Sequence, residues 1–131
     1  MTTLFSKIIN NEIESFKVYE NNQITAILDV NPISEGHLLV IPHEEVDDIF
    51  NLTSSRYHEL WDVVSYLSGV LRDTFNSPRV GIAVEGFGVP HTHVHLVPIY
   101  SGNELNPDRA KSASSTELKA TFDKLRAAIK S

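Results

Sequence analysis

Residues 60–75 carry the pattern that most restricts how this chain can fold. Apolar side chains recur there at helical spacing, at Leu60, Val63, Val64, Leu67, Val70, Leu71 and Phe75. This spacing predicts one long amphipathic helix. Thr53 or Ser54 can cap its start, and the Asn-Ser-Pro sequence at 76–78 is expected to end it.

Short runs with strand character flank this helix on both sides. Bounded by turn-forming residues, they lie at 16–19, 24–29, 36–41, 80–85 and 92–99. Two more helices are expected, at 4–9 and from near Ser114, where Glu117 suits a capping box. This order predicts an α+β fold: an antiparallel sheet of about five strands with a long central helix and a C-terminal helix.

The length of 131 residues suits a single domain with its own core. We expect one domain over 1–131, with its core at about 4–99 and a polar loop and C-terminal helix over 100–131. The net charge is -6 and basic residues do not cluster, which argues against a nucleic-acid partner. Cysteine is absent, so disulfides and thiolate metal sites are excluded. No apolar leader or membrane span is evident, so a soluble, cytoplasmic protein with no membrane partner is expected.

Three of the six histidines stand at alternate positions, His91, His93 and His95. On a strand these side chains share one face, and Thr92, Val94 and Leu96 share the other. The apolar face can enter the core, so the histidine face meets solvent, a partner or a cleft. Chance placement on a strand remains one interpretation, although ionisable groups seldom cluster without a role.

A metal site is the second interpretation, because imidazole is the commonest protein ligand for metals. The outer two histidines would lie about 13 Å apart along an extended strand, at roughly 3.3 Å per residue. One ion with bonds of about 2.0–2.1 Å cannot easily hold both. The middle histidine and one neighbour would need further ligands from elsewhere.

Nucleophilic catalysis is the third interpretation. A partly unprotonated imidazole can attack phosphorus or an acyl carbon. Neighbouring histidines can hold its tautomer, stabilise charge and protonate a leaving group. The glycines just upstream would let the backbone approach a phosphate closely.

The chain resembles the histidine triad (HIT) family at this point. The family motif is His-x-His-x-His followed by two apolar residues, and residues 91–97 read HTHVHLV, with Thr92 mildly off pattern. The resemblance covers about 4–99 and includes FSKII at 5–9, VYE at 18–20, ILD at 27–29, Pro32 and GHLLVIP at 36–42. It therefore rests on several segments in their expected order.

The resemblance implies a nucleotide hydrolase or transferase that cleaves at the α-phosphate of a nucleoside phosphoramidate or dinucleoside polyphosphate. It implies that His93 is the nucleophile, forming a nucleotidyl-histidine without a metal or cofactor, that His91 lies near the phosphate and leaving group, and that His95 and His37 support the cluster. Asp29 would bind the ribose hydroxyls. Gly86 and Gly88 could offer N–H groups to the phosphate. The base would lie among six apolar residues: Phe5, Ile8, Ile27, Leu28, Val30 and Leu39. The ligand would be a purine nucleotide or nucleoside phosphoramidate, and the protein a homodimer.

Two departures from the family pattern affect these expectations. Some members hold a structural zinc, but three of its four ligand positions here read Thr3, Ser6 and Glu45. We therefore predict no structural zinc. The loop before the triad, residues 84–90, lacks the Asn, Gln and Ser/Thr that many members place near the phosphate. Leaving-group preference therefore cannot be transferred from the family.

Three functions remain open on the sequence. The first is a nucleotidyl hydrolase that uses His93. The second is a nucleotide-binding or interaction module with little turnover, which the shortened loop favours. The third is a metalloenzyme that uses His91, His93 and His95.

Overall fold

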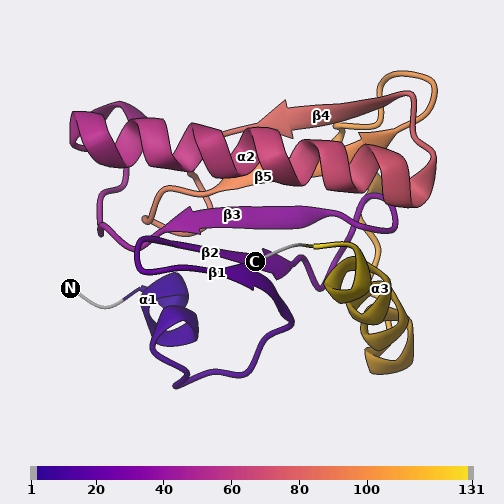
Figure 1. Ribbon diagram of the computed structural model, residues 1–131, viewed down its shortest axis with the longest axis horizontal. Helices are drawn as coiled ribbons and strands as arrows, with labels where there is room; N and C mark the ends of the chain where they lie inside the picture. Colours follow the sequence, from indigo (N-terminus) through magenta and orange to yellow (C-terminus); the bar gives the residue numbers. More distant parts are fainter. Residues whose placement is uncertain (1–2, 130–131) are drawn as a thin grey trace.

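The computed structural model describes residues 3–129 and confirms the predicted α+β fold (Figure 1). The strands form one antiparallel sheet in the order β1-β2-β3-β5-β4. The ends of the predicted domain, residues 1–2 and 130–131, lie outside the described residues. In chain order the elements are α1 (Leu4–Ile9), β1 (Lys17–Glu20), β2 (Ile24–Leu28), β3 (Leu38–Pro42), the 3-10 helix η1 (Ile49–Asn51), α2 (Ser54–Phe75), β4 (Arg79–Ala83), β5 (Val94–Ile99), the 3-10 helix η2 (Pro107–Arg109) and α3 (Ser115–Ala128).

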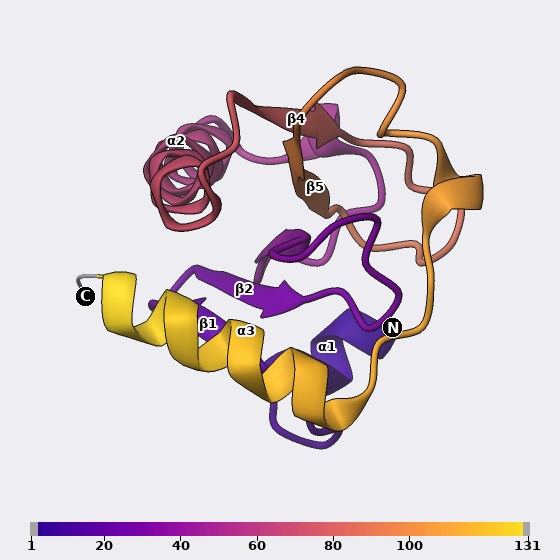
Figure 2. The same cartoon turned by 90° about the vertical axis from the view of Figure 1, so that its right-hand side faces the viewer.

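Both faces of the sheet are covered, by different helices. Figure 2 shows α2 and α1 on opposite sides of the sheet, with α3 crossing near β1 and β2. The larger core lies between the sheet and the two long helices, where Val40, Leu67 and Leu96 are fully buried. A smaller core lies under α1, where Phe5 packs with Ile41. Because alternate strand residues enter different cores, β2 and β3 are buried along their whole length.

Different kinds of contact stabilise the helix ends that the sequence predicts. Ser114 caps α3 in a capping box with Glu117, as the sequence predicts. Asn76 ends α2 in the left-handed conformation. Thr53 holds the N-cap position of α2 without a side-chain cap bond, and its backbone N–H donates instead to the Glu44 carboxylate at 3.1 Å.

The fifth strand is shorter than predicted, because β5 begins at Val94 and not at Thr92. The Thr92 N–H and hydroxyl both donate to the Val46 carbonyl, at 2.7 and 2.8 Å. Residues 92 and 93 have no regular secondary structure, and residues 91–94 are all buried. His91 and His93 therefore precede the strand. Their rings still lie on one side of the chain with His95, because Phe5 contacts both His91 and His93, and His93 contacts His95.

Gly36 shapes the turn that leads into β3. Its φ is +95°, a region that favours glycine. A Cβ at this position would lie 2.5 Å from the Phe75 ring. The residue after this turn is His37, so Gly36 determines how that histidine enters the sheet.

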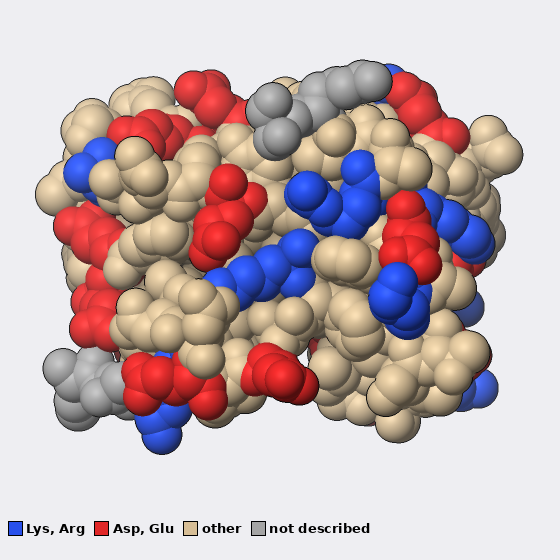
Figure 3. All heavy atoms as spheres, turned by 60° about the horizontal axis from the view of Figure 1, so that its bottom comes forward, with Lys and Arg blue, Asp and Glu red and all other residues tan. Residues whose placement is uncertain are grey.

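Charged side chains of both signs mix on the surface. On the face shown in Figure 3, acidic and basic groups are interspersed, without one continuous basic patch. This arrangement agrees with the acidic net charge of -6. Among the helices described, none combines the length and apolar character needed to cross a bilayer.

Candidate active site

The ends of β2, β3 and β5 bring a carboxylate and two histidines together. Asp29 directly follows β2, and its N–H donates to the carbonyl of His37 at 3.0 Å, just before β3. In the pairing of β3 with β5, Leu39 lies opposite His95. Antiparallel pairing therefore brings three residues that are distant in the sequence into one cluster.

Burial keeps the two histidines of this cluster neutral near pH 7. It lowers the pKa of His37 to about 4, although Asp29 acts to raise it, and the nearby His95 lowers it further. Burial is also the main cause that lowers the pKa of His95, with His93 adding to it and Asp29 opposing it. Both rings can therefore donate one proton and accept one.

Hydrogen bonds determine where those protons lie. The N–H of Ile33 donates to Nδ1 of His37 at 3.0 Å, so the neutral ring carries its proton on Nε2. That Nε2 lies 3.0 Å from Nδ1 of His95 and 3.5 Å from Oδ2 of Asp29. His37 thus donates to His95, and His95 carries its own proton on Nε2.

His93 has the opposite tautomer. Its Nδ1 lies 2.8 Å from the carbonyl oxygen of His91, which can only accept. The neutral ring therefore has its lone pair on Nε2, the form that a nucleophile requires. The ring centroids of Phe5 and His95 lie 4.8 and 5.1 Å from that of His93, both in edge-to-face contact.

His91 is fully buried, and both of its ring nitrogens are bonded to the protein. Nε2 donates to the carbonyl of Pro42 at 2.8 Å, and Nδ1 accepts from the hydroxyl of Thr3 at 2.9 Å. This ring links α1, the end of β3 and the triad. Its expected role beside the phosphate and leaving group remains a prediction.

A large cavity of about 1100 Å³ lies between α1, β2 and α3. The six apolar positions that the sequence assigned to a base all line it, and Asp29 lies at its rim. Its lining also includes residues that the sequence did not suggest, among them Glu14, Lys17, Leu118 and Phe122. The predicted positions are Phe5, Ile8, Ile27, Leu28, Val30 and Leu39.

A smaller cavity of about 340 Å³, here the triad cavity, lies on the other side of Asp29. Three chain segments enclose it: residues 31–33, the loop at 83–89 and residues 105–110. His37, His93 and His95 line it, as do Gly86 and Gly88, whereas His91 is not among the described residues that do so. The two cavities share Asp29, so a ligand that fills both would pass this carboxylate.

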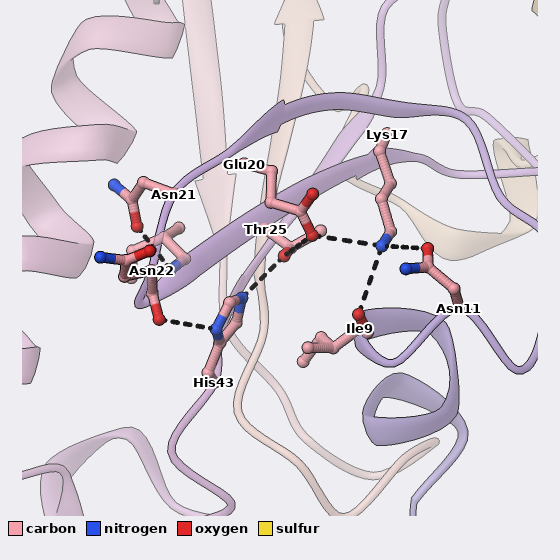
Figure 4. A network of polar contacts seen from close by, with 9 residues as sticks. Ile9, Asn11, Lys17, Glu20, Asn21, Asn22, Thr25 and His43 are labelled. Atoms are coloured by element: carbon pink, nitrogen blue, oxygen red, sulfur yellow. Dashed lines mark hydrogen bonds and ion pairs between the residues drawn. The ribbon is translucent and has the colours of Figure 1, made fainter.

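Polar contacts at both ends hold α1 against the large cavity. Thr3 binds His91 at its start. Figure 4 shows Lys17 at the other end, where its Nζ donates to the carbonyl of Ile9 at 3.3 Å and to Oδ1 of Asn11 at 2.7 Å. The same Nζ forms an ion pair with Glu20 at 3.2 Å.

Comparison with known proteins agrees with this geometry. Residues 10–102 match the HIT domain. The chain belongs to the HIT domain family. It is 35% identical over 118 residues to an uncharacterized HIT-like protein of Borreliella burgdorferi, covering 79% of this chain and 85% of that protein. It is 33% identical over 107 residues to the adenosine 5′-monophosphoramidase of Candida albicans, covering 72% and 68%.

The HIT fold extends over nearly the whole chain. The crystal structure of a HIT-like protein from Bartonella henselae superposes with a TM-score of 0.88 at 26% sequence identity, covering 98% of this chain and 96% of that one. A hydrolase named for a nucleoside phosphoramidate thus occurs among the relatives of this HIT protein.

Hydroxyl groups occupy two positions at which some HIT proteins hold zinc. Oγ1 of Thr3 lies 2.8 Å from Oγ of Ser6, and each oxygen also accepts the backbone N–H of the other residue. Because the Thr3 hydroxyl donates to His91, this network is closed without an ion. Glu45, the third replaced position, is exposed.

Within residues 3–129, one group of side chains has a geometry that could hold a metal ion. It consists of Asp29, His37 and His95, whose three ligand atoms lie within 4.8 Å of one another. The proton on Nε2 of His37 already occupies the middle of this group. A metal would have to displace it, because the Ile33 N–H holds the tautomer. The absence of a structural zinc remains a prediction.

The segment after β5 contributes to the site more than its polar sequence indicates. Leu105, Pro107 and Ala110 line the triad cavity. Leu105 packs against Gly81 of β4, where a Cβ would lie 2.9 Å from its side chain. In the sequence, the one sign of this contribution is Leu105, an isolated leucine in a polar stretch.

Proposed function

We propose that this HIT protein hydrolyses or transfers nucleotides by cleavage at the α-phosphate of a nucleoside phosphoramidate or dinucleoside polyphosphate. The observation that carries the proposal is the His93 tautomer. Its Nδ1–H is held by the His91 carbonyl, which leaves Nε2 as a nucleophile in the triad cavity. A purine nucleoside would occupy the large cavity, with its ribose hydroxyls on Asp29.

The reaction proceeds in two displacements. Nε2 of His93 attacks phosphorus, the bond to the leaving group breaks, and that group departs with the electron pair and takes a proton. Water then attacks the nucleotidyl-histidine, and the P–N electron pair returns to Nε2. Splitting the reaction in this way replaces one difficult step with two easier ones.

The other histidines position His93 and stabilise the negative charge of the phosphate. The Nε2–H of His95 donates to a phosphate oxygen, and His37 holds His95 in that tautomer. His91 positions His93 through its carbonyl. Gly86 and Gly88 line the same cavity, and we expect their N–H groups to stabilise the same charge.

A nucleotide-binding module with little turnover is the second candidate. Glu85 and the exposed Phe87 stand in the loop beside the triad, and neither side chain can donate a hydrogen bond to phosphate. Such a protein would still bind nucleotide in the large cavity. We further propose that the protein is a cytoplasmic homodimer.

The test is AMP release from adenosine 5′-phosphoramidate in excess EDTA, with wild type beside His93→Ala. Release by the wild type and none by the variant, with AMP binding retained in both, supports metal-free catalysis through His93. Binding without release by the wild type would favour the module. Release that chelator abolishes would favour the metalloenzyme.

A further inference from the structure

A second polar cluster lies beside α1, and none of its described members lines the triad cavity. Figure 4 shows it as one continuous row of contacts from His43, just after β3, to the end of α1. The row runs through Thr25 on β2 and then through Glu20 and Lys17 on β1. Thr25 and Glu20 are cross-strand partners, so the sheet fixes their spacing. The nucleotidyl transfer proposed above makes no use of His43 or Thr25.

The ring of His43 has a defined tautomer when it is neutral. Its Nδ1 lies 3.0 Å from the carbonyl oxygen of Asn22, which can only accept, so Nδ1 carries the proton. Its Nε2 lies 2.8 Å from Oγ1 of Thr25 and therefore accepts the hydroxyl proton. The neutral ring thus has Thr25 as its donor, and the side chain of Thr25 is fully buried.

Charged and titratable groups face His43 from two neighbouring segments. Burial is the largest cause that acts on the pKa of His43, and it lowers that pKa. The hydrogen bond to Asn22 and the charge of Glu20 raise it. Lys17, on the same strand as Glu20, and His91, just before β5, lower it further. The neutral ring is therefore the form present at neutral pH, and it gains a proton in acid below the ordinary range of histidine.

The hydroxyl of Thr25 has one proton and two acceptors within reach. Its Oγ1 lies 2.8 Å from Nε2 of His43 and 3.4 Å from Oε2 of Glu20. A hydroxyl group donates once. While the proton points to His43, the carboxylate receives no bond from Thr25. A proton on Nε2 of His43 would turn the hydroxyl, because the ring would then donate to Oγ1 and the hydroxyl to Glu20.

Lys17 connects the state of this carboxylate to α1. Its Nζ has three hydrogens, and all three have partners: the Ile9 carbonyl at 3.3 Å, Oδ1 of Asn11 at 2.7 Å and Oε2 of Glu20 at 3.2 Å. A turned Thr25 hydroxyl would compete with Lys17 for the same carboxylate oxygen. The ion pair would then weaken, and the two bonds to the end of α1 would lose the carboxylate that fixes their donor.

We propose that His43 and Thr25 are positioning residues for α1, and that a proton on His43 loosens this helix. They act through the ion pair of Glu20 with Lys17. Because α1 forms part of the wall of the large cavity, nucleoside binding should weaken as His43 becomes charged. By linkage, a nucleoside that orders α1 should lower the affinity of His43 for a proton by the same factor. The effect on nucleoside binding rests on the function proposed above, whereas the effect on α1 in the free protein does not.

The first experiment measures amide exchange of the free protein at pH 7.5 and pH 5, as protection factors for residues 7–11. In the wild type we expect the protection of this segment to fall by roughly threefold to tenfold in acid, because its contacts to Lys17 weaken. Amides of α2 in the same spectra report any global loss of stability. Thr25→Val should keep high protection at both pH values, because no hydroxyl competes for Glu20. Thr25→Ser retains the hydroxyl and should behave as the wild type.

His43→Leu should show the opposite behaviour. Without a ring to accept its proton, the Thr25 hydroxyl turns to Glu20 at every pH, so protection of the segment should be low and independent of pH. Adding Thr25→Val to His43→Leu should restore high protection, which a merely destabilised variant would not show. His58→Leu is the matched control, because Nδ1 of His58 also bonds a carbonyl, that of Ser54 at 2.7 Å, but its ring is exposed on α2.

The second experiment measures the Kd for adenosine by calorimetry at the same two pH values. Adenosine carries no phosphate group, so titration of the ligand phosphate does not enter. The Kd should rise by roughly threefold in acid for the wild type and stay constant for Thr25→Val. An NMR titration of His43 with and without adenosine should show its affinity for a proton lowered by that factor in the complex.

Three results would overturn this inference alone. They are a wild-type segment whose protection does not change with pH, an equal loss of protection in Thr25→Val, and a double variant no better protected than His43→Leu. If adenosine fails to bind the wild type at pH 7.5 while exchange behaves as expected, the proposed nucleoside site is overturned and the role of His43 in positioning α1 stands.

Discussion

The proton positions on four histidines follow from partners whose roles are unambiguous. The Ile33 N–H can only donate, and the carbonyls of Pro42 and His91 can only accept. These three contacts assign the tautomers of His37, His91 and His93 directly, and His95 follows from His37. Backbone geometry thus leaves the lone pair of His93 on Nε2, as the proposed nucleophile requires.

We expect long-range ¹⁵N–¹H correlation spectra at neutral pH to show His93 as the Nδ1–H tautomer. His37, His91 and His95 should appear as Nε2–H tautomers, because each accepts a hydrogen bond on Nδ1. A His93 signal of the Nε2–H form would contradict its assignment as nucleophile. Exposed His58, whose Nδ1 lies 2.7 Å from the Ser54 carbonyl, should also appear as the Nδ1–H tautomer and serves as an internal reference for that form.

His37 should make stability fall with acidity. Its pKa is about 4 in the folded protein against an ordinary value of 6.5, so the unfolded chain binds the proton more tightly. Stability is therefore complete above pH 6.5 and is lost as pH falls towards 4, by up to about 3 kcal/mol. Urea unfolding between pH 7.5 and 4 measures this slope.

His37→Asn should be less stable at pH 7.5 and should show a shallower slope over the same range. His58→Asn, at an exposed position of α2, is the control and should keep the slope of the wild type. An unchanged slope in His37→Asn would mean that other groups cause the acid sensitivity.

At the residue scale the resemblance indicated several residues that the structure brings together, and their roles remain predictions. Each apolar residue assigned to the base lines the large cavity, and His37 does lie beside His95. The place of His91 could not be predicted, because it depends on a hydroxyl of Thr3 that lies 88 positions away in the chain.

At the scale of elements, α1 connects ligand binding to the triad. Its six residues are too few for a helix that is stable in isolation. It depends on Thr3 at one end and Lys17 at the other, and Phe5 between them contacts His93. Contacts outside the helix therefore determine how well the large cavity is formed.

We expect Lys17→Met to loosen α1 while retaining most of the apolar stem. Amide hydrogen exchange across residues 4–11 should accelerate, and the Kd for AMP should rise by roughly threefold to tenfold, because two hydrogen bonds to the helix end are lost. Exchange spectrometry and calorimetric titration measure the two effects. Lys7→Met, on the exposed side of the same helix, is the matched control. Equal behaviour of the two variants would show that the Lys17 contacts do not hold α1.

Helix positions were predictable from local signals, whereas several strand boundaries were not: β3 begins at Leu38 and β4 ends at Ala83, each two residues inside its predicted range. The apolar stripe and Asn76 mark α2, and Ser114 with Glu117 marks α3. The late start of β5 results from the bonds between Thr92 and Val46, two residues far apart in the sequence. The alternation of residue types within 92–99 does not indicate that contact.

At the scale of the whole molecule, β4 is an open edge of the sheet. It pairs with β5 on one side, and Ile82 on it is exposed. An edge with exposed apolar residues is a surface at which a second copy can extend the sheet. We expect sedimentation equilibrium to give a mass of twice 14.7 kDa. Ile82→Lys should shift the equilibrium towards the single chain, and a wild-type mass of 14.7 kDa would contradict the homodimer.

The carboxylate shared by the two cavities has a consequence for how this protein can change over evolutionary time. Among the described residues, Asp29 alone appears in the lining of both the large and the triad cavity. Substitutions on the two sides should therefore contribute nearly additive free energies to selectivity. A lineage could exchange the loop at 84–90 or the segment at 105–110 and acquire a new leaving group while its nucleoside preference is inherited unchanged.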